Sequence, residues 1–145
     1  MCQAKVRLIK LGKSSYVKSA YQLHLLYFLK MHITKSQDAK AYEAPGHHQM
    51  QMHRIQGKDV SPLNGVWSAR LTLEPGGYVE ASTSPAAKLY IVDSGTLEFT
   101  GGETTVQITK GDSVFVLPGE SRAFKEINQS TAVLYLVMLE DYQHS

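Results

Sequence analysis

The most constraining feature of this sequence is a series of short apolar runs, each ended by a tight-turn signal. The runs are rich in β-branched and aromatic residues, as β-strands are, and they occupy 66–73, 88–93, 96–100, 104–109, 113–117 and 131–139. Clusters containing glycine separate them at 75–77, 93–95, 101–102, 110–112 and 118–119, as expected for turns. Many short strands at regular spacing predict an antiparallel β-sandwich or β-barrel from about residue 47 to 139.

The pattern within each run predicts which faces are buried. Leu97 and Phe99 alternate with polar neighbours, as do Val106 and Ile108, so each of these strands is expected to bury one face. The run 131–139 is apolar without alternation. That pattern predicts a strand covered on both faces.

Charge divides the chain into two parts. Residues 1–37 carry seven Lys or Arg and no acid, whereas residues 38–145 carry eight basic and 13 acidic residues. We therefore expect a basic N-terminal extension over 1–37, to which the sequence assigns no structure, and a barrel domain over 38–145. The extension is open to three interpretations: a start placed too far upstream, a short docking segment, or a targeting signal.

Composition narrows the partners and the compartment. The apolar run 21–29 is nine residues long, too short to span a bilayer. The basic residues form no pattern typical of nucleic-acid binding. Cys2 is the only cysteine, so no internal disulfide forms, which is typical of a reducing compartment. We expect a cytoplasmic protein with neither membrane nor nucleic-acid partners.

Two motif frames resemble those of the small type-2 cupins, the RmlC-like jelly-roll proteins. The first cupin motif has the form G-x5-HxH-x3-E-x6-G, and its spacing is kept by Gly76, Ser82-Thr83-Ser84, Lys88 and Gly95. The second resembles Gly111-Asp112 through Pro118-Gly119 to Arg122. The resemblance covers about residues 40–140 and implies an all-β cupin barrel; resemblance to small cupins also implies a homodimer.

The sequence departs from the family at every metal-ligand position. Ser82, Ser84, Lys88 and Arg122 stand where the family has two histidines, a glutamate and a third histidine. Serine hydroxyls are poor ligands, and protonated lysine and arginine offer no lone pair to a transition metal. We therefore expect no metal at the usual cupin position and no cofactor.

The same frame predicts a small electropositive pocket. Residues two apart in a strand share a face, so Glu80, Ser82 and Ser84 are expected to face the barrel interior. Lys88, Tyr90 and Val92 are expected to share a second interior face, and Arg122 and Phe124 a third. Two buried cations need partners, which are either internal, at Glu80, Glu120 or Glu126, or supplied by an anionic ligand.

The histidines near the start of the barrel leave a further possibility open. In a regular strand, His47 and His53 share one face, and His48, Met50, Met52 and Arg54 share the other. His47 and His53 are then roughly 20 Å apart at about 3.3 Å per residue, too far to hold one ion together. A metal at a non-standard site through His47, His48 or His53 stays open, with rim or interface positions as the alternative.

These observations support three hypotheses of function. The first is a metal-independent cupin that binds an acidic or carbonyl-bearing small molecule and catalyses isomerisation, epimerisation or elimination. In it Lys88 is the base or electrophile, Tyr90 a candidate acid, and Arg122 the anion clamp. Ser82, Ser84, Glu80, Phe124 and His47 complete the substrate-binding set. The second is a non-catalytic binding or regulatory module, and the third is a metal-dependent cupin enzyme with relocated ligands.

Overall fold

A computed structural model describes residues 31–143, of which residues 34–143 belong to one compact unit. Cys2, the apolar run 21–29 and the basic residues up to Lys30 lie outside the described range. Residues 31–143 contain no α-helix, and so no helix in this range is long and apolar enough to cross a membrane. A single turn of 3-10 helix, Ser36–Asp38, precedes the strands.

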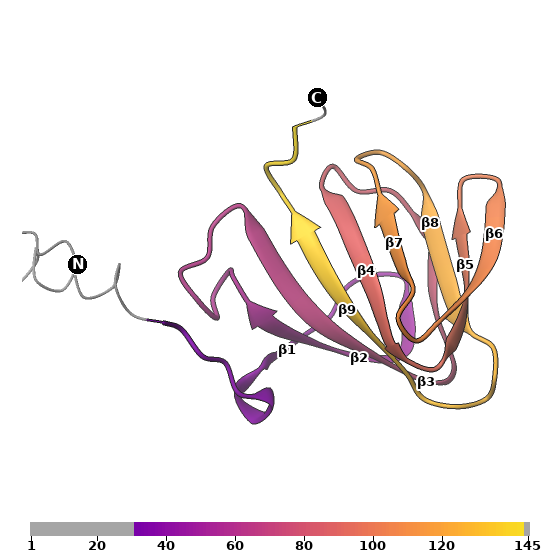
Figure 1. The fold of residues 1–145 in the computed structure, drawn as a ribbon, viewed down its shortest axis with the longest axis horizontal. Helices are drawn as coiled ribbons and strands as arrows, with labels where there is room; N and C mark the ends of the chain where they lie inside the picture. The colour runs from indigo at the N-terminus through magenta and orange to yellow at the C-terminus, as the bar shows by residue number, and fades with distance from the viewer. Residues whose placement is uncertain (1–30, 144–145) are drawn as a thin grey trace, which may run out of the picture. The chain divides into compact units, whose positions relative to one another are not determined.

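Nine strands form one antiparallel sheet that curls into a nearly closed barrel (Figure 1). Their bounds are β1 Lys40–Tyr42, β2 His47–Gln56, β3 Val66–Ser82, β4 Ala87–Ser94, β5 Thr96–Gly101, β6 Thr104–Thr109, β7 Ser113–Val116, β8 Arg122–Glu126 and β9 Ala132–Leu139. The strand order is β6-β5-β8-β3-β9-β4-β7, with β2 added to β3 and β1 to β2. The predicted all-β cupin-like barrel is confirmed.

The longest strand, β3, differs from expectation. The cluster Pro75-Gly76-Gly77 was expected to end a strand, but β3 continues through it for 17 residues. Its first half pairs with β9 and its second half with β8. Gly76 has φ +74°, a conformation that glycine adopts without strain. The glycines therefore bend β3 from one neighbour to the other instead of ending it.

The core lies between the inward faces of these strands. Leu71, Leu97 and Leu134 are among its fully buried side chains. Val106 was expected on a buried face but is 47% exposed, and it lies on β6, which is an edge strand of the sheet.

Strand β9 was expected to be covered on both faces. This expectation is wrong, because the described residues of the chain bury only one of the two faces. Leu134 and Leu136 are buried, but Val133, Tyr135 and Val137 between them stay partly exposed. The same holds on the neighbouring β4, where Ile91 is 38% exposed. One side of this part of the sheet thus packs on the core, and an apolar outer side remains uncovered.

Candidate functional site

One cavity of about 400 Å³ brings together most of the residues that the motif frames single out. The loop after β1 and strands β2, β3, β4, β8 and β9 contribute to its wall. Its polar lining comes from Ser82, Thr83, Ser84, Lys88, Tyr90, Arg122, His47, Arg54, Tyr42 and Glu43, and its apolar lining includes Trp67, Leu71 and Met138. The volume is within the range of small-molecule sites.

Arg122 begins β8 and is only 5% exposed. Its Nε donates to the Tyr90 hydroxyl oxygen at 2.8 Å, and its Nη1 donates to the Ser82 carbonyl oxygen at 3.1 Å and to the Ser82 hydroxyl oxygen. All three acceptors are neutral. The guanidinium is therefore held in place on the cavity wall, but its charge is not neutralised by these contacts.

Lys88 lies on β4 and is 6% exposed. Within residues 31–143 its ammonium group makes neither a salt bridge nor a hydrogen bond to a side chain. Burial, and after it the positive charge of Arg122, lowers the pKa of Lys88 to about 8. The prediction that Lys88, Tyr90 and Val92 share an inward face is confirmed, since all three are buried.

The three glutamates considered as partners for these cations have other contacts. Glu126 accepts from the backbone N–H groups of Gly76 and Asn128, at 2.9 and 2.6 Å. Glu120 accepts from the N–H of Leu117 at 3.1 Å. The Glu80 carboxylate is 2.6 Å from Nε2 of His48. An internal glutamate partner for Lys88 or Arg122 is therefore absent in the described part of the chain.

The expected inward position of Glu80 is wrong, and a β-bulge is the reason. Val79 pairs with Phe124 and Ser82 with Arg122. Three residues of β3 thus span two residues of β8, so the alternation of faces is interrupted. Val79 is buried, and Ser82, although largely exposed, lines the cavity and contacts Arg122, whereas Glu80 is exposed outside the cavity.

Tyr90 connects the cavity to the aromatic core. It is 2% exposed, and its ring packs edge-to-face against Phe99 and Phe124. Burial raises the pKa of Tyr90, while the charge of Arg122 and its hydrogen bond act in the opposite direction. Phe124 shares the inward face of Arg122 as expected, but it stacks on Phe99 in the core and is not part of the cavity wall.

His47 reaches the cavity through a second bulge. Gln49 has φ +50°, and the register of β2 against β3 shifts between His48 and Met50. The expected separation of His47 from Met52 is therefore wrong: His47 and Met52 both line the cavity, and His48 pairs with Glu80 outside. His47 and Met52 also line a neighbouring groove of about 660 Å³, together with Gln51 and His53.

The ring of His47 has a defined orientation. Its Nδ1 lies 2.8 Å from the carbonyl oxygen of Pro45. Because a carbonyl oxygen can only accept, Nδ1 carries the hydrogen and Nε2 of the neutral ring carries the lone pair. Burial is the main cause that lowers the pKa of His47, and the charges of Arg122 and Lys88 lower it further.

The motif frames did not single out Tyr42, Glu43 or Arg54 as cavity residues. Arg54 lies 4.8 Å from the ring centre of Tyr42 and 5.1 Å from that of Trp67, and its Nη1 is 2.8 Å from an Asp59 carboxylate oxygen. Tyr42 and Glu43 belong to β1 and the loop after it. Their place over the barrel depends on long-range pairing of β1 with β2, which has no local sequence signal.

The residues at the family's metal-ligand positions do not fit a metal ion. Ser82, Ser84, Lys88 and Arg122 all line the one cavity, but two of them are cations and Ser82 already accepts from Arg122. Within residues 31–143, no three His, Cys, Asp or Glu side chains come close enough together to hold an ion. The wall instead presents hydrogen-bond donors and positive charge.

Comparison with known proteins identifies a matching family and a similar protein. The Cupin domain family matches residues 69–139. A protein of Mycobacterium tuberculosis named Beta-D-galactosidase Rv1717 is 29% identical over 110 residues, which cover 74% of this chain and 93% of that protein.

Solved structures with the same fold include proteins with different names. A predicted oxalate decarboxylase of Thermotoga maritima has a TM-score of 0.66 at 20% identity, covering 74% of this chain and 98% of that one. The polyketide cyclase RemF of Streptomyces resistomycificus has 0.67 at 14%, covering 80% and 89%. An RmlC-like cupin of Shewanella frigidimarina has 0.64 at 11%, covering 79% and 95%. At these identities the likeness shows the fold alone.

Proposed function

Since the chain is a small cupin, we propose that its barrel binds an acidic or carbonyl-bearing small molecule between Lys88 and Arg122, without a metal. The observation that carries the proposal is the pair of buried cations on one cavity wall with only neutral described partners. Burying a charge without a counter-charge is unfavourable. An anionic ligand removes that penalty, so the site is suited to binding anions.

The rest of the wall fits a ligand with hydroxyl groups and an apolar face. Ser82, Thr83 and Ser84 line the cavity on one side, and the indole of Trp67 lines it on another. The name of the mycobacterial relative indicates a galactoside as its substrate. We therefore propose an acidic sugar, such as a hexuronate or an aldonate, as the ligand class.

Glycoside hydrolysis by the usual pair of carboxyl groups is not supported for this cavity. That mechanism needs one carboxyl group as acid and a second as nucleophile or base. Among the described residues, Glu43 is the one carboxylate on the cavity wall. We propose proton transfer instead, as isomerisation, epimerisation or elimination, with Lys88 and Arg122 stabilising an enolate and Tyr90 as the acid.

A non-catalytic binding module is the second candidate, and one observation favours it. Three donor contacts of Arg122 are already satisfied by Tyr90 and Ser82, an arrangement that stabilises the barrel without a substrate. Both candidates require anion binding. They differ in whether a bound acid exchanges a proton with solvent.

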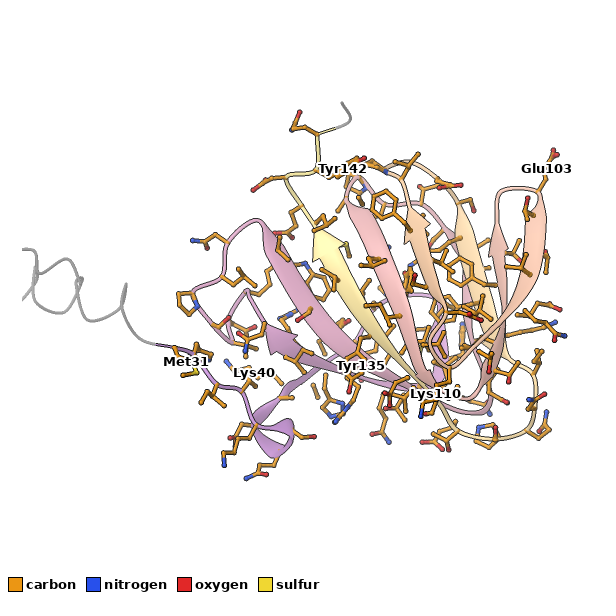
Figure 2. The ribbon with its side chains drawn as sticks, in the orientation of Figure 1. Met31, Lys40, Glu103, Lys110, Tyr135 and Tyr142 are labelled. Carbon is orange, nitrogen blue, oxygen red and sulfur yellow. The ribbon has the colours of Figure 1, made fainter. Side chains whose placement is uncertain are left out.

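Anion binding is tested by thermal unfolding with D-galacturonate, D-galactonate, galactose 1-phosphate and neutral D-galactose. We expect the acids to raise the melting temperature of the wild type, and Lys88→Met to lose most of that increase. Lys110→Met is the matched control, because Lys110 is exposed in the turn between β6 and β7 (Figure 2). Equal stabilisation of the wild type and Lys88→Met, or none of either, would contradict the proposal.

We also propose that the protein is a homodimer that covers the apolar outer face of β7, β4 and β9. Across these strands Leu89 pairs with Phe115 and Val137, and Ile91 pairs with Tyr135. Ile91 and Phe115 are 38% and 45% exposed, and none of these five side chains is charged. A second copy fits such a face, because a two-fold axis brings the same uncharged patch against itself.

A further inference from the structure

We infer that His47 is the base that removes the proton from the carbon next to the carboxylate held by Lys88 and Arg122. This rests on the proposed function and assigns the proton transfer to a residue outside both motif frames. Three properties of His47 support the role: its place on the cavity wall, its fixed tautomer and its charge state.

The backbone conformation of β2 brings His47 to the cavity wall. The bulge at Gln49 turns His47 toward the cavity that Lys88 and Arg122 line from β4 and β8. The three residues therefore approach one bound ligand from different strands. A base on one wall and cations on others is the arrangement that proton abstraction next to a carboxylate requires.

The tautomer leaves the reactive nitrogen free. Nδ1–H donates to the Pro45 carbonyl at 2.8 Å, so the lone pair is on Nε2. Within residues 31–143 no hydrogen bond occupies Nε2. A histidine whose one nitrogen is fixed by a backbone carbonyl presents the other as an acceptor in a defined direction.

Three other groups on the cavity wall, Tyr90, Lys88 and Arg122, are less suited as the base at neutral pH. Burial raises the pKa of Tyr90, so its hydroxyl keeps its proton. The pKa of Lys88 is about 8, so most of this group is protonated at pH 7 and acts as a cation. Arg122 stays protonated throughout. His47, with its lowered pKa, is the neutral base among these groups.

The proposed step balances without a cofactor. The Cα–H bond of the bound acid breaks, its proton goes to Nε2 of His47, and the electron pair moves onto the carboxylate to give an enediolate. Lys88 and Arg122 stabilise the added negative charge. Return of a proton from His47 or from Tyr90 to the same or the opposite face regenerates the acid or its epimer.

The test is exchange of carbon-bound protons in D₂O, followed by proton NMR. The probes are D-galactonate at C2 and D-galacturonate at C5, each the carbon next to the carboxylate. We expect the wild type to exchange at least one of them. His47→Gln, whose amide can still donate to Pro45, should lose about 100-fold or more of the exchange rate. His48→Gln is the matched control, because its neighbouring ring pairs with Glu80 outside the cavity.

The pH profile separates a base from a structural residue. The groups on the cavity wall that titrate or carry charge are Tyr42, Glu43, Arg54, Lys88, Tyr90 and Arg122. At sub-saturating acid, where the rate reports the free protein, we expect the exchange rate to rise with pH below 6.5 as His47 loses its proton, and to fall near pH 8 as Lys88 loses its charge.

The outcomes are distinguishable from those of the binding experiment. Wild-type exchange that persists in His47→Gln would overturn the role of His47. Binding of the acids without exchange would also overturn it, yet leave anion binding in place. If none of the acids binds, the proposed function and this inference both fail.

Discussion

At the residue scale, the defining feature is positive charge that the barrel buries with neutral partners. Lys88 and Arg122 are both less than a tenth exposed, and the contacts of Arg122 are to a hydroxyl group, a carbonyl group and a serine side chain. Such a site is less stable than an apolar one until an anion arrives. Stability of the free protein should therefore depend on the protonation state of Lys88.

Because the pKa of Lys88 is lowered, the stability of the folded protein should increase as pH rises and Lys88 loses its proton. Between the folded pKa of about 8 and the ordinary value of 10.5, the unfolded chain binds more protons than the folded one, so Lys88 contributes stability that grows as pH rises. Lys88→Met lacks this contribution. We expect the mutant to be more stable than the wild type at pH 7, and the difference to shrink between pH 8 and 10.

Urea unfolding at pH 7, 8, 9 and 10 measures this difference. The range stops at pH 10 because burial raises the pKa of Tyr42 to about 12 and also that of Tyr90, and both tyrosines reduce stability at higher pH. Lys110→Met should follow the wild type at every pH. A difference between Lys88→Met and the wild type that does not change with pH would show that Lys88 keeps an ordinary pKa.

Sequence spacing predicted the cavity positions of Lys88 and Tyr90, because β4 is regular there. Ser82, Ser84 and Arg122 also line the cavity, as the motif frames predicted. The spacing failed for Glu80, which was expected to face the interior, and for the residues that were expected to share a strand face with His47.

Each lies next to an irregularity in strand pairing, which interrupts the alternation of faces. At the first, Glu80 and Ala81 of β3 lie opposite one residue of β8, and neither is a glycine. At the second, residues 74–77 of β3 lie opposite Gln49, and the glycines there locally indicate a turn between two strands.

At the scale of elements, β2 and β3 decide the shape of the site. The bulge in β2 brings His47 inward, and the bend of β3 at Gly76 and Gly77 carries Ser82 to the cavity. The two features lie against each other. A Cβ atom on Gly77 would meet the carbonyl oxygen of Gln49 at 2.5 Å and that of Glu74 at 3.0 Å.

We predict that Gly77→Ala destabilises the barrel by about 1–3 kcal/mol, because backbone atoms must move to relieve the contact. Gly101→Ala is the control, since no atom lies within 4 Å of the added carbon there. Denaturant unfolding of both variants measures the effect. Equal stability of the two variants would mean that β2 and β3 separate easily at the bulge.

The strands themselves were largely predictable, with one instructive exception. Turns at 93–95, 101–102 and 110–112 separate the strands as expected, since the chain reverses there. Residues 75–77 have the same composition, yet β3 passes through them with its hydrogen bonds shared between β9 and β8. Whether such a segment ends a strand or continues it depends on which strands lie on either side. A local sequence pattern holds no information about those neighbours.

At the scale of the whole molecule, the outer face of β7, β4 and β9 is an exposed apolar surface. Ile91→Glu places a charge on it, and we expect this change to convert a dimer into a monomer. Val106→Glu is the control, because Val106 is exposed on the edge strand β6, away from this face. Tyr135, labelled in Figure 2, belongs to the same face.

Light scattering after gel filtration measures the mass directly. The wild type and Val106→Glu should have twice the mass of one chain at micromolar concentration, and Ile91→Glu the mass of a single chain. A wild type that is monomeric, or an Ile91→Glu variant that stays dimeric, would contradict the proposed interface.

The central claim is that an anion binds between Lys88 and Arg122, and the pKa of Lys88 is its most direct measure. NMR titration of the lysine side-chain carbons, with Lys88→Met to assign the resonance, gives this value with and without a saturating acid from the binding panel. We predict a pKa near 8 in the free protein and a rise of a unit or more when the acid is bound, because a nearby negative charge favours the ammonium form. A pKa of Lys88 that stays the same in the presence of every acid in the panel would contradict the claim.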